Sequence, residues 1–312
     1  MINWGILGFG RMGTTFANAI KETSNSKLIN IASKTGKTLP NFKNKSYEDL
    51  INSNDIDAIY ISSLNNTHIN LIKEISNTKK NILCEKPVAM NLKDILEVEK
   101  IIIDKKIKFY EAIAYYSHPQ TKEIINLIEN DEIGEVESIE SSFGFKSKFK
   151  PSSRLYNKEL GGGSILDLGC YPISFFMLFT NSKDKIILGE KKLSYSKSDV
   201  DDEASATLTY SNKIKGKIKV SIKSNLDNKC TIYGSKGFIK VNNPWLPNNE
   251  AVIEISSKNH FYIKQIKSKL SVYANQLENV SNSFMNEKQK NNLFDIEKSK
   301  INMKLIENWL KN

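Results

Sequence analysis

The sequence has few of the residues that build disulfide frameworks and metal sites. Its 312 residues include only three cysteines and three histidines. The cysteines, Cys84, Cys170 and Cys230, are far apart and odd in number, which predicts neither a disulfide framework nor a Cys-x-x-Cys metal site. We therefore expect a protein of a reducing compartment that holds no metal.

Arginine is also scarce, although the chain is basic. The formal net charge is +10, from 45 lysines and arginines against 35 acidic residues, yet Arg11 and Arg154 are the only arginines. The lysines are spread along the whole chain, whereas a nucleic-acid surface is typically a patch or stripe of clustered Lys and Arg. The sequence therefore predicts no nucleic-acid partner, and the charge is suited to attracting anionic small molecules.

Long hydrophobic runs are missing as well. The most apolar run, residues 174–179, is far too short to span a bilayer, and the N-terminus lacks the basic and apolar regions of a signal peptide. We expect a cytoplasmic protein without membrane association. The length predicts about two domains, and 39% hydrophobic and 26% charged residues are typical of a soluble globular enzyme.

A glycine motif stands close to the start of the chain. Gly8-Phe9-Gly10-Arg11-Met12-Gly13 directly follows the apolar run from Ile2 to Leu7. Glycines at these three positions allow a tight turn, the approach of a pyrophosphate and close packing of the next helix on the strand. Because the helix start then offers unpaired N–H groups to phosphates, the motif predicts a bound dinucleotide.

The end of the second predicted strand bears on which dinucleotide binds. Leu28–Ala32 leads into Ser33-Lys34-Thr35, where a chain that prefers NAD typically carries Asp or Glu. A hydroxyl and an ammonium group favour the 2'-phosphate of NADP instead. An ordinary polar turn with solvated lysines is the alternative, and NAD remains possible.

The first third of the chain alternates strand and helix patterns. Strands are predicted over 57–63, 81–85 and 107–112, and helices from Ile69 to Ile75 and over 91–104, with Asn91 as the helix cap. This alternation predicts an α/β Rossmann domain with a parallel, doubly wound sheet over residues 1–117.

The pattern changes after Ser117. Helices are predicted over 120–129, 164–180, 266–286 and 295–310, and strands over 136–145, 186–193 and 204–210. Lysines alternate with apolar residues from Lys213 to Val220, which is typical of a half-buried strand, and Gly234-Ser235-Lys236-Gly237 predicts a hairpin. Residues 118–312 are therefore expected to form an α+β domain with an open, largely antiparallel sheet.

Cys84-Glu85-Lys86-Pro87 follows the fourth strand of the first domain. The segment therefore lies at a carboxyl end of the parallel sheet, where open sheets bind their ligands. A lysine here can reach the junction between cofactor and substrate, although a surface Glu-Lys pair before a proline turn is the structural alternative.

Several segments together resemble one known family. They are Gly8–Gly13, residues 57–61 leading to Asn65 and His68, Cys84–Pro87, Glu111-Ala112 followed by His118-Pro119-Gln120, and Leu160–Pro172 with its three glycines. The chain resembles the glucose–fructose oxidoreductase, inositol dehydrogenase and rhizopine catabolism (Gfo/Idh/MocA) family. Within it, the chain is similar to the branch of dihydrodiol dehydrogenase and NADP-dependent D-xylose 1-dehydrogenase.

This resemblance implies the catalytic residues. Lys86 would contact the reacting hydroxyl and the nicotinamide ribose, and Asp167 and Tyr171, four residues apart on one helical face, would face the substrate. Many relatives carry His at the position of Tyr171. Tyrosine has a free pKa of about 10, which a neighbouring ammonium group such as that of Lys86 lowers, so Tyr171 is expected to be the general acid/base of a hydride transfer. The structural alternatives are aromatic packing for Tyr171 and a backbone cap for Asp167.

The resemblance also implies binding residues. Besides the glycine turn, Ser33, Lys34 and Lys86, the cofactor would contact Ser63, Leu64, Asn65, His68 and Glu85. Tyr116 and Arg154 are expected near the substrate. Relatives often have Pro at the position of Leu64 and Arg-Phe where this chain has Tyr116-Ser117, so its substrate can differ from theirs. His118 is expected to have a structural role.

The sequence as a whole predicts an NADP-dependent oxidoreductase that acts on a sugar, polyol or related hydroxyl or carbonyl compound. One alternative is a reductase of a nucleotide-linked keto-sugar or another biosynthetic carbonyl compound. Another is a non-catalytic nucleotide-binding sensor or partner protein. As in the family, the second-domain sheet is expected to pack against another subunit, which gives a homodimer or a higher homo-oligomer.

Overall fold

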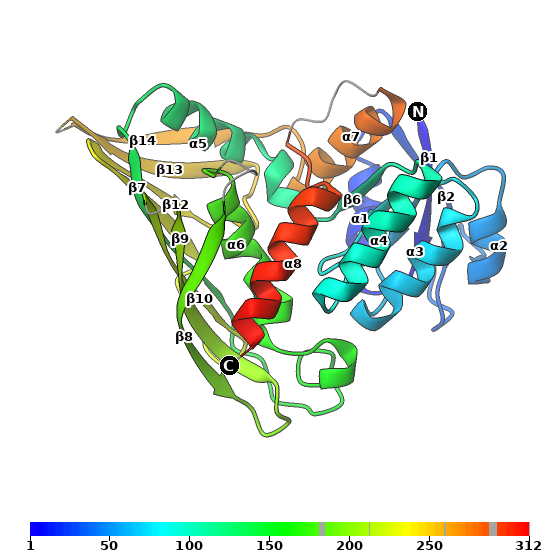
Figure 1. Ribbon diagram of the computed structural model, residues 1–312. Helices are drawn as coiled ribbons and strands as arrows, with labels where there is room; N and C mark the ends of the chain where they lie inside the picture. The colour runs from blue at the N-terminus through cyan, green and yellow to red at the C-terminus, as the bar shows by residue number, and fades with distance from the viewer. Residues whose placement is uncertain (181–184, 212, 259, 287–291, 312) are drawn as a thin grey trace. The chain divides into compact units, whose positions relative to one another are not determined.

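The computed structural model describes residues 1–180, 185–211, 213–258, 260–286 and 292–311 (Figure 1). The chain forms two compact units, one of residues 1–117 and 270–300 and one of residues 118–269 and 301–312. The first division falls after Ser117. Residues 270–300, however, cluster with the first unit, which differs from the expected second domain over 118–312.

The first unit is built around a six-stranded sheet in the order β3-β2-β1-β4-β5-β6, in which every pair of neighbours is parallel. Its strands are β1 (Ile2–Leu7), β2 (Ser26–Ala32), β3 (Asn44–Lys45), β4 (Ala58–Ile61), β5 (Asn81–Cys84) and β6 (Phe109–Glu111). Its helices are α1 (Arg11–Ile20), α2 (Tyr47–Asn52), α3 (His68–Ser76), α4 (Leu92–Lys105) and α7 (Val272–Met285), with short 3₁₀ turns at Asn65–Thr67 and Ala114–Ser117. This confirms the predicted Rossmann architecture.

Both faces of this sheet are covered, because alternate strand residues point to opposite sides. Trp4 and Tyr60 pack with Phe16 of α1 and Phe284 of α7 in one apolar core. A β-carbon at Gly5 would instead meet Leu50 of α2 on the opposite face. Figure 1 shows α1 and α7 on one side of the sheet and α3 and α4 on the other.

Local sequence signals account for several helix ends. The Asn91 side chain accepts a hydrogen bond from the Asp94 amide at 2.9 Å and caps α4, as predicted. Ser271 caps α7 in the same way. The helix predicted from Ile266 therefore begins later, because residues up to Lys267 belong to a strand.

The second unit contains an eight-stranded sheet in the order β14-β13-β12-β11-β7-β10-β9-β8. Its strands are β7 (Val136–Gly144), β8 (Ile186–Tyr195), β9 (Asp201–Tyr210), β10 (Ile214–Ser221), β11 (Lys229–Gly234), β12 (Gly237–Asn242), β13 (Glu250–Ser257) and β14 (His260–Lys267). Only β7 and β10 pair in parallel, so the expected open, largely antiparallel sheet is confirmed. Gly234 pairs with Gly237 at the predicted hairpin, whereas β13 was not predicted.

One face of this sheet is covered by helices and the other carries exposed side chains. The covering elements are α5 (Pro119–Glu129), the π-helical turn Ile165–Gly169, α6 (Cys170–Met177) and the end of α8 (Ile296–Leu310) (Figure 1). A 3₁₀ turn at Lys158–Leu160 precedes the π-helical turn along the chain. In β10, Ile214, Ile218 and Val220 are buried while the intervening lysines are exposed, which confirms the predicted alternation. Among the described residues, no helix is long and apolar enough to cross a membrane.

Candidate functional site

The glycine turn of the first unit is held by close backbone contacts. Gly8 has φ of +91°, and a β-carbon there would lie 2.7 Å from the Ser63 nitrogen and 2.8 Å from the Ser62 carbonyl carbon. The Ser62 hydroxyl donates a hydrogen bond to the Gly8 carbonyl at 2.6 Å. Ser62, to which no sequence motif pointed, fastens the turn to the end of the neighbouring strand β4.

The start of α1 is suited to an anion. Gly10 precedes the helix, no side chain caps its first N–H groups, and the first turn holds no acidic residue. A β-carbon at Gly10 would have no neighbour within 4 Å, so the space in front of these N–H groups is open. Uncapped N–H groups at a helix start, with a glycine in front, fit the pyrophosphate of a dinucleotide.

The end of β2 forms a built turn rather than a loose loop. The Asn44 side chain accepts a hydrogen bond from the Ser33 amide at 2.8 Å and donates one to the Ser33 carbonyl at 3.1 Å. The Ser33 hydroxyl lies 2.9 Å from that of Thr35 and accepts from the Thr35 amide. Exposed Lys34 lies 5.7 Å from the centre of the Tyr47 ring. The turn therefore holds one hydroxyl in place and carries an exposed ammonium group.

Lys86 follows β5 in a segment that is tied down on both sides. The Glu85 carboxylate accepts a short hydrogen bond from the Tyr60 hydroxyl and another from the Lys86 amide at 3.3 Å. The buried Glu111 carboxylate accepts from the Val88 amide at 3.3 Å. The backbone on either side of Lys86 is therefore fixed by two buried carboxylates.

His68 connects two predicted binding segments. Its Nδ1 lies 3.0 Å from the Pro87 carbonyl and its Nε2 lies 3.3 Å from the Ser63 carbonyl. Burial lowers the pKa of His68, so the neutral ring donates to only one of the two carbonyls. The residue therefore orders the loop that carries Leu64 and Asn65, in which Leu64 is 45% exposed.

In the second unit, Tyr171 lies in an aromatic setting. Its ring is 5.1 Å from the Phe143 ring, edge to face, and 6.1 Å from the Trp245 ring. The Trp245 indole donates a hydrogen bond to the Ser142 carbonyl at 3.1 Å, which fixes the position of the Trp245 ring. The half-buried Tyr171 thus packs against rings on β7 and on the loop after β12.

Asp167 is buried and ion-paired. Its Oδ1 lies 2.8 Å from Nη1 of Arg154, whose side chain is 43% exposed against 6% for that of Asp167. Asp167 and Arg154, each predicted singly as a site residue, are therefore brought together as an ion pair. Asp167 lies in the π-helical turn and Tyr171 in the first turn of α6, so the single helix predicted over 164–180 is in fact two segments.

The glycine run before this helix serves the fold. A β-carbon at Gly162 would lie 2.8 Å from the Asn157 carbonyl oxygen, and one at Gly163 would overlap the Asp201 carboxylate. Gly163 also has φ of +115°. These two glycines make room for other parts of the protein.

Two other predicted residues are explained by local packing. The Tyr116 ring is buried edge to face against Phe294, at 5.1 Å, and against Tyr115. His118 caps α5, its Nδ1 accepting from the Gln120 amide at 3.1 Å, and burial lowers its pKa to about 4. The expected structural role of His118 agrees with this geometry.

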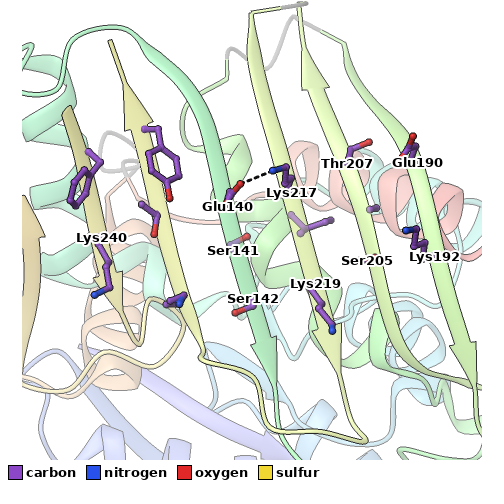
Figure 2. A pocket seen from close by; sticks show the side chains of 16 residues that line it. Glu140, Ser141, Ser142, Glu190, Lys192, Ser205, Thr207, Lys217, Lys219 and Lys240 are labelled. Carbon is purple, nitrogen blue, oxygen red and sulfur yellow. Dashed lines mark hydrogen bonds and ion pairs between the residues drawn. The ribbon is translucent and has the colours of Figure 1, made fainter. Parts of the chain in front are cut away.

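The uncovered face of the eight-stranded sheet holds a shallow pocket (Figure 2). It is lined by side chains from β7 to β12, including Lys192, Lys217, Lys219, Lys229 and Lys240 together with Glu140 and Glu190. Figure 2 shows Lys217 and Glu140 reaching toward each other across neighbouring strands, where their charged atoms are 2.9 Å apart. None of the predicted catalytic residues lines this pocket.

Comparison with known proteins assigns both units. Residues 2–113 match the model of the oxidoreductase family with an NAD-binding Rossmann fold, and residues 121–240 match the GFO/IDH/MocA C-terminal domain. Trans-1,2-dihydrobenzene-1,2-diol dehydrogenase of Xenopus tropicalis is 31% identical over 258 residues, which cover 78% of this chain and 76% of that protein. An NADP-dependent D-xylose 1-dehydrogenase of Haloferax volcanii is 30% identical over 45% of this chain and 43% of that protein.

Solved structures share the fold. The 3-ketoreductase KijD10 of Actinomadura kijaniata, in complex with NADP and TDP-benzene, has a TM-score of 0.89 at 20% identity and covers 98% of this chain and 96% of its own. Aldose-aldose oxidoreductase of Caulobacter crescentus has a TM-score of 0.88 at 18% identity, with 99% and 96% covered. Both units, their order and their motifs agree with the resemblance found in the sequence, and the chain belongs to the Gfo/Idh/MocA family of oxidoreductases.

Proposed function

We propose that this protein is an NADP-dependent oxidoreductase acting on the CH–OH group, or the corresponding carbonyl, of a sugar, a polyol or a related compound. The observation that carries the proposal is the start of α1, which follows Gly8 and Gly10 and has no side-chain cap. Ser33 and Lys34, and no carboxylate, follow the end of the neighbouring strand β2. When bound, NADP supplies the site that gives or takes the hydride. NADP is named in the relatives from Haloferax and Actinomadura, which supports this choice.

We assign the proton transfer to Tyr171. We propose its phenol as the acid/base group of the second unit and Lys86 as the catalytic cation of the first unit. Asp167 is held by Arg154, so we assign to this pair the orientation of the substrate hydroxyl groups. Tyr60, Glu85 and Glu111 hold the backbone around Lys86.

The substrate class is tested by activity. NADP reduction is measured with aldoses, inositols and vicinal diols, and NADPH oxidation is measured with a nucleotide-linked 3-keto-sugar. We expect turnover with a free sugar or diol, as the names of the relatives suggest. Turnover with the keto-sugar nucleotide alone would favour the biosynthetic reductase. Tight NADPH binding without turnover of any compound would favour a sensor.

Cofactor choice is tested by titrating NADPH and NADH against the intrinsic fluorescence of the three tryptophans. We expect NADPH to bind more tightly because Lys34 offers a cation to the 2'-phosphate. Tighter binding of NADH would overturn the interpretation of the β2 end.

We also propose a homodimer in which the uncovered face of the eight-stranded sheet packs on its copy. The face carries both lysines and glutamates, among them Lys217 with Glu140 and Lys240 with Glu254, so two copies related by a twofold axis can pair unlike charges. Light scattering should give twice the mass of 35.4 kDa. Thr207→Arg, in the middle of this face, should give the monomer, and a monomeric unmodified protein would contradict the proposal.

A further inference from the structure

A buried carboxylate on β9 lies against the start of the helical segment that carries Asp167 and Tyr171. Asp201 is 3% exposed, and its Oδ2 accepts hydrogen bonds from the Ser164 hydroxyl at 2.6 Å and from the Ile165 amide at 2.8 Å. Ser164 itself provides no side-chain cap to the helix. Asp201 therefore does from a separate strand what an N-cap residue normally does within the chain.

The chain makes room for this carboxylate. Any side chain at position 163 would overlap Asp201, and φ of +115° at Gly163 is a conformation that side chains rarely adopt. The Gly163 carbonyl in turn accepts from the Asp167 amide at 3.1 Å. Asp201 is thus connected through the backbone of Gly163–Ile165 to the residue that pairs with Arg154.

The charge of Asp201 suits this position. Burial raises its pKa to about 6, and the hydrogen bonds from Ser164 and Ile165 act in the opposite direction. At neutral pH the group is therefore a carboxylate, which a helix start stabilises through its N–H groups and its dipole. A buried carboxylate without such donors would be costly, so the segment and Asp201 stabilise each other.

We propose that Asp201 is a positioning residue, which fixes the start of the helical segment and thereby the orientation of Asp167 and Tyr171 in the reaction. The expected effect of Asp201 on turnover rests on the proposed function. Its expected effect on the order of residues 163–171 does not. Asp201 contacts Gly163–Ile165, and we propose that it acts on the reaction only through this segment.

The test compares Asp201→Asn with Asp202→Asn in the full-length protein. Asp202 is the matched control, because its carboxylate instead accepts from Ser194 at 2.5 Å and lies 3.3 Å from Lys223. Hydrogen–deuterium exchange of peptides covering residues 163–171 is measured without substrate. We expect exchange about tenfold faster in Asp201→Asn, since a charge-assisted hydrogen bond is weakened, and unchanged exchange in Asp202→Asn.

Kinetics give the second readout. For Asp201→Asn we expect kcat to fall about tenfold or more, while the KM for NADPH stays within about twofold. Ser164→Ala, which removes one donor and keeps the carboxylate, should show a smaller change in the same direction and serves if Asp201→Asn fails to fold.

Two results would overturn the proposal. One is unchanged exchange over 163–171 in both Asp201→Asn and Ser164→Ala, and the other is faster exchange with full kcat. Full turnover in Tyr171→Phe is a separate result. It would remove Tyr171 from the proposed reaction, whereas the exchange measurement would still decide whether Asp201 holds the segment.

Discussion

The side chain of Glu111 accepts a hydrogen bond from the amide of Val88 and so connects the end of β6 to the segment that follows Lys86. Glu111 is buried, and burial raises its pKa to about 7 from an ordinary value of 4.5. The hydrogen bonds from Ser299 and Val88 lower this pKa, whereas the neighbouring Glu85 raises it. The Glu111 carboxyl group therefore titrates near neutral pH.

This pKa predicts how stability depends on pH. Between pH 4.5 and about 7 the folded protein holds a proton on Glu111 that the unfolded chain has released, so the free energy of unfolding falls as pH rises and levels off above about 7. Glu111→Gln removes this dependence. The difference in the free energy of unfolding between wild type and Glu111→Gln should change by on the order of 3 kcal/mol from pH 4.5 to pH 8.

Urea denaturation at several pH values measures this difference. Glu74→Gln on the exposed face of α3 is the control, and its difference from wild type should stay constant. A constant difference for Glu111→Gln as well would show that Glu111 does not titrate in this range.

The two first glycines of the turn are expected to behave differently. A β-carbon in Gly8→Ala would meet the backbone of Ser62 and Ser63 at positive φ, so this change should cost about 2 kcal/mol of stability or more. Gly10→Ala finds open space at φ of −88° and should keep the thermal midpoint. It should weaken NADPH binding about tenfold or more, because a methyl group then stands where the pyrophosphate approaches.

Thermal melts and fluorescence titrations separate the two effects. Undiminished NADPH binding by Gly10→Ala would argue against the dinucleotide at this helix start.

Reversing the charge of Lys34 tests the cofactor preference. Lys34→Glu should weaken NADPH binding about 10- to 100-fold and leave NADH binding nearly unchanged, because only NADPH carries the 2'-phosphate. Lys27→Glu, exposed at the opposite end of the same strand β2, is the matched control and should change neither. Equal losses for both cofactors would mean that Lys34 does not contact the 2'-phosphate.

Tyr171→Phe tests the acid/base assignment. The ring contacts with Phe143 and Trp245 remain, so folding and NADPH binding should be kept, while kcat should fall about 100-fold or more. Tyr195→Phe, 52% exposed in the same unit, should retain full turnover. Steady-state kinetics of both variants check this, and undiminished turnover of Tyr171→Phe would reject the mechanism.

Much of the architecture could be predicted because its signals are local. The glycine turn needs only strand, glycines and helix in succession, Asn91 caps the helix that follows it directly, and the lysines of β10 alternate because one face of that strand is buried. Strand β13 has the same kind of alternation, with Ala251, Ile253 and Ile255 buried, and its pattern could have been recognised.

The surroundings of the predicted site residues were less accessible to sequence reasoning. Tyr60 and Glu85 are 25 residues apart, and Asp201 lies 36 residues from Ile165, so no local pattern connects either pair. A π-helical turn within residues 164–180 likewise has no signature in hydrophobic periodicity.

The sequence by itself determined the family, the succession of strands and helices, and the types of group available for chemistry, because these follow from neighbouring residues. Only the tertiary structure decided that residues 270–300 join the first unit, and that Asp167 is ion-paired to Arg154. It also decided that Gly163 accommodates the Asp201 carboxylate. Each of these depends on which distant segments pack together. Burial and hydrogen bonding between such segments also set the charge of Glu111 and of Asp201.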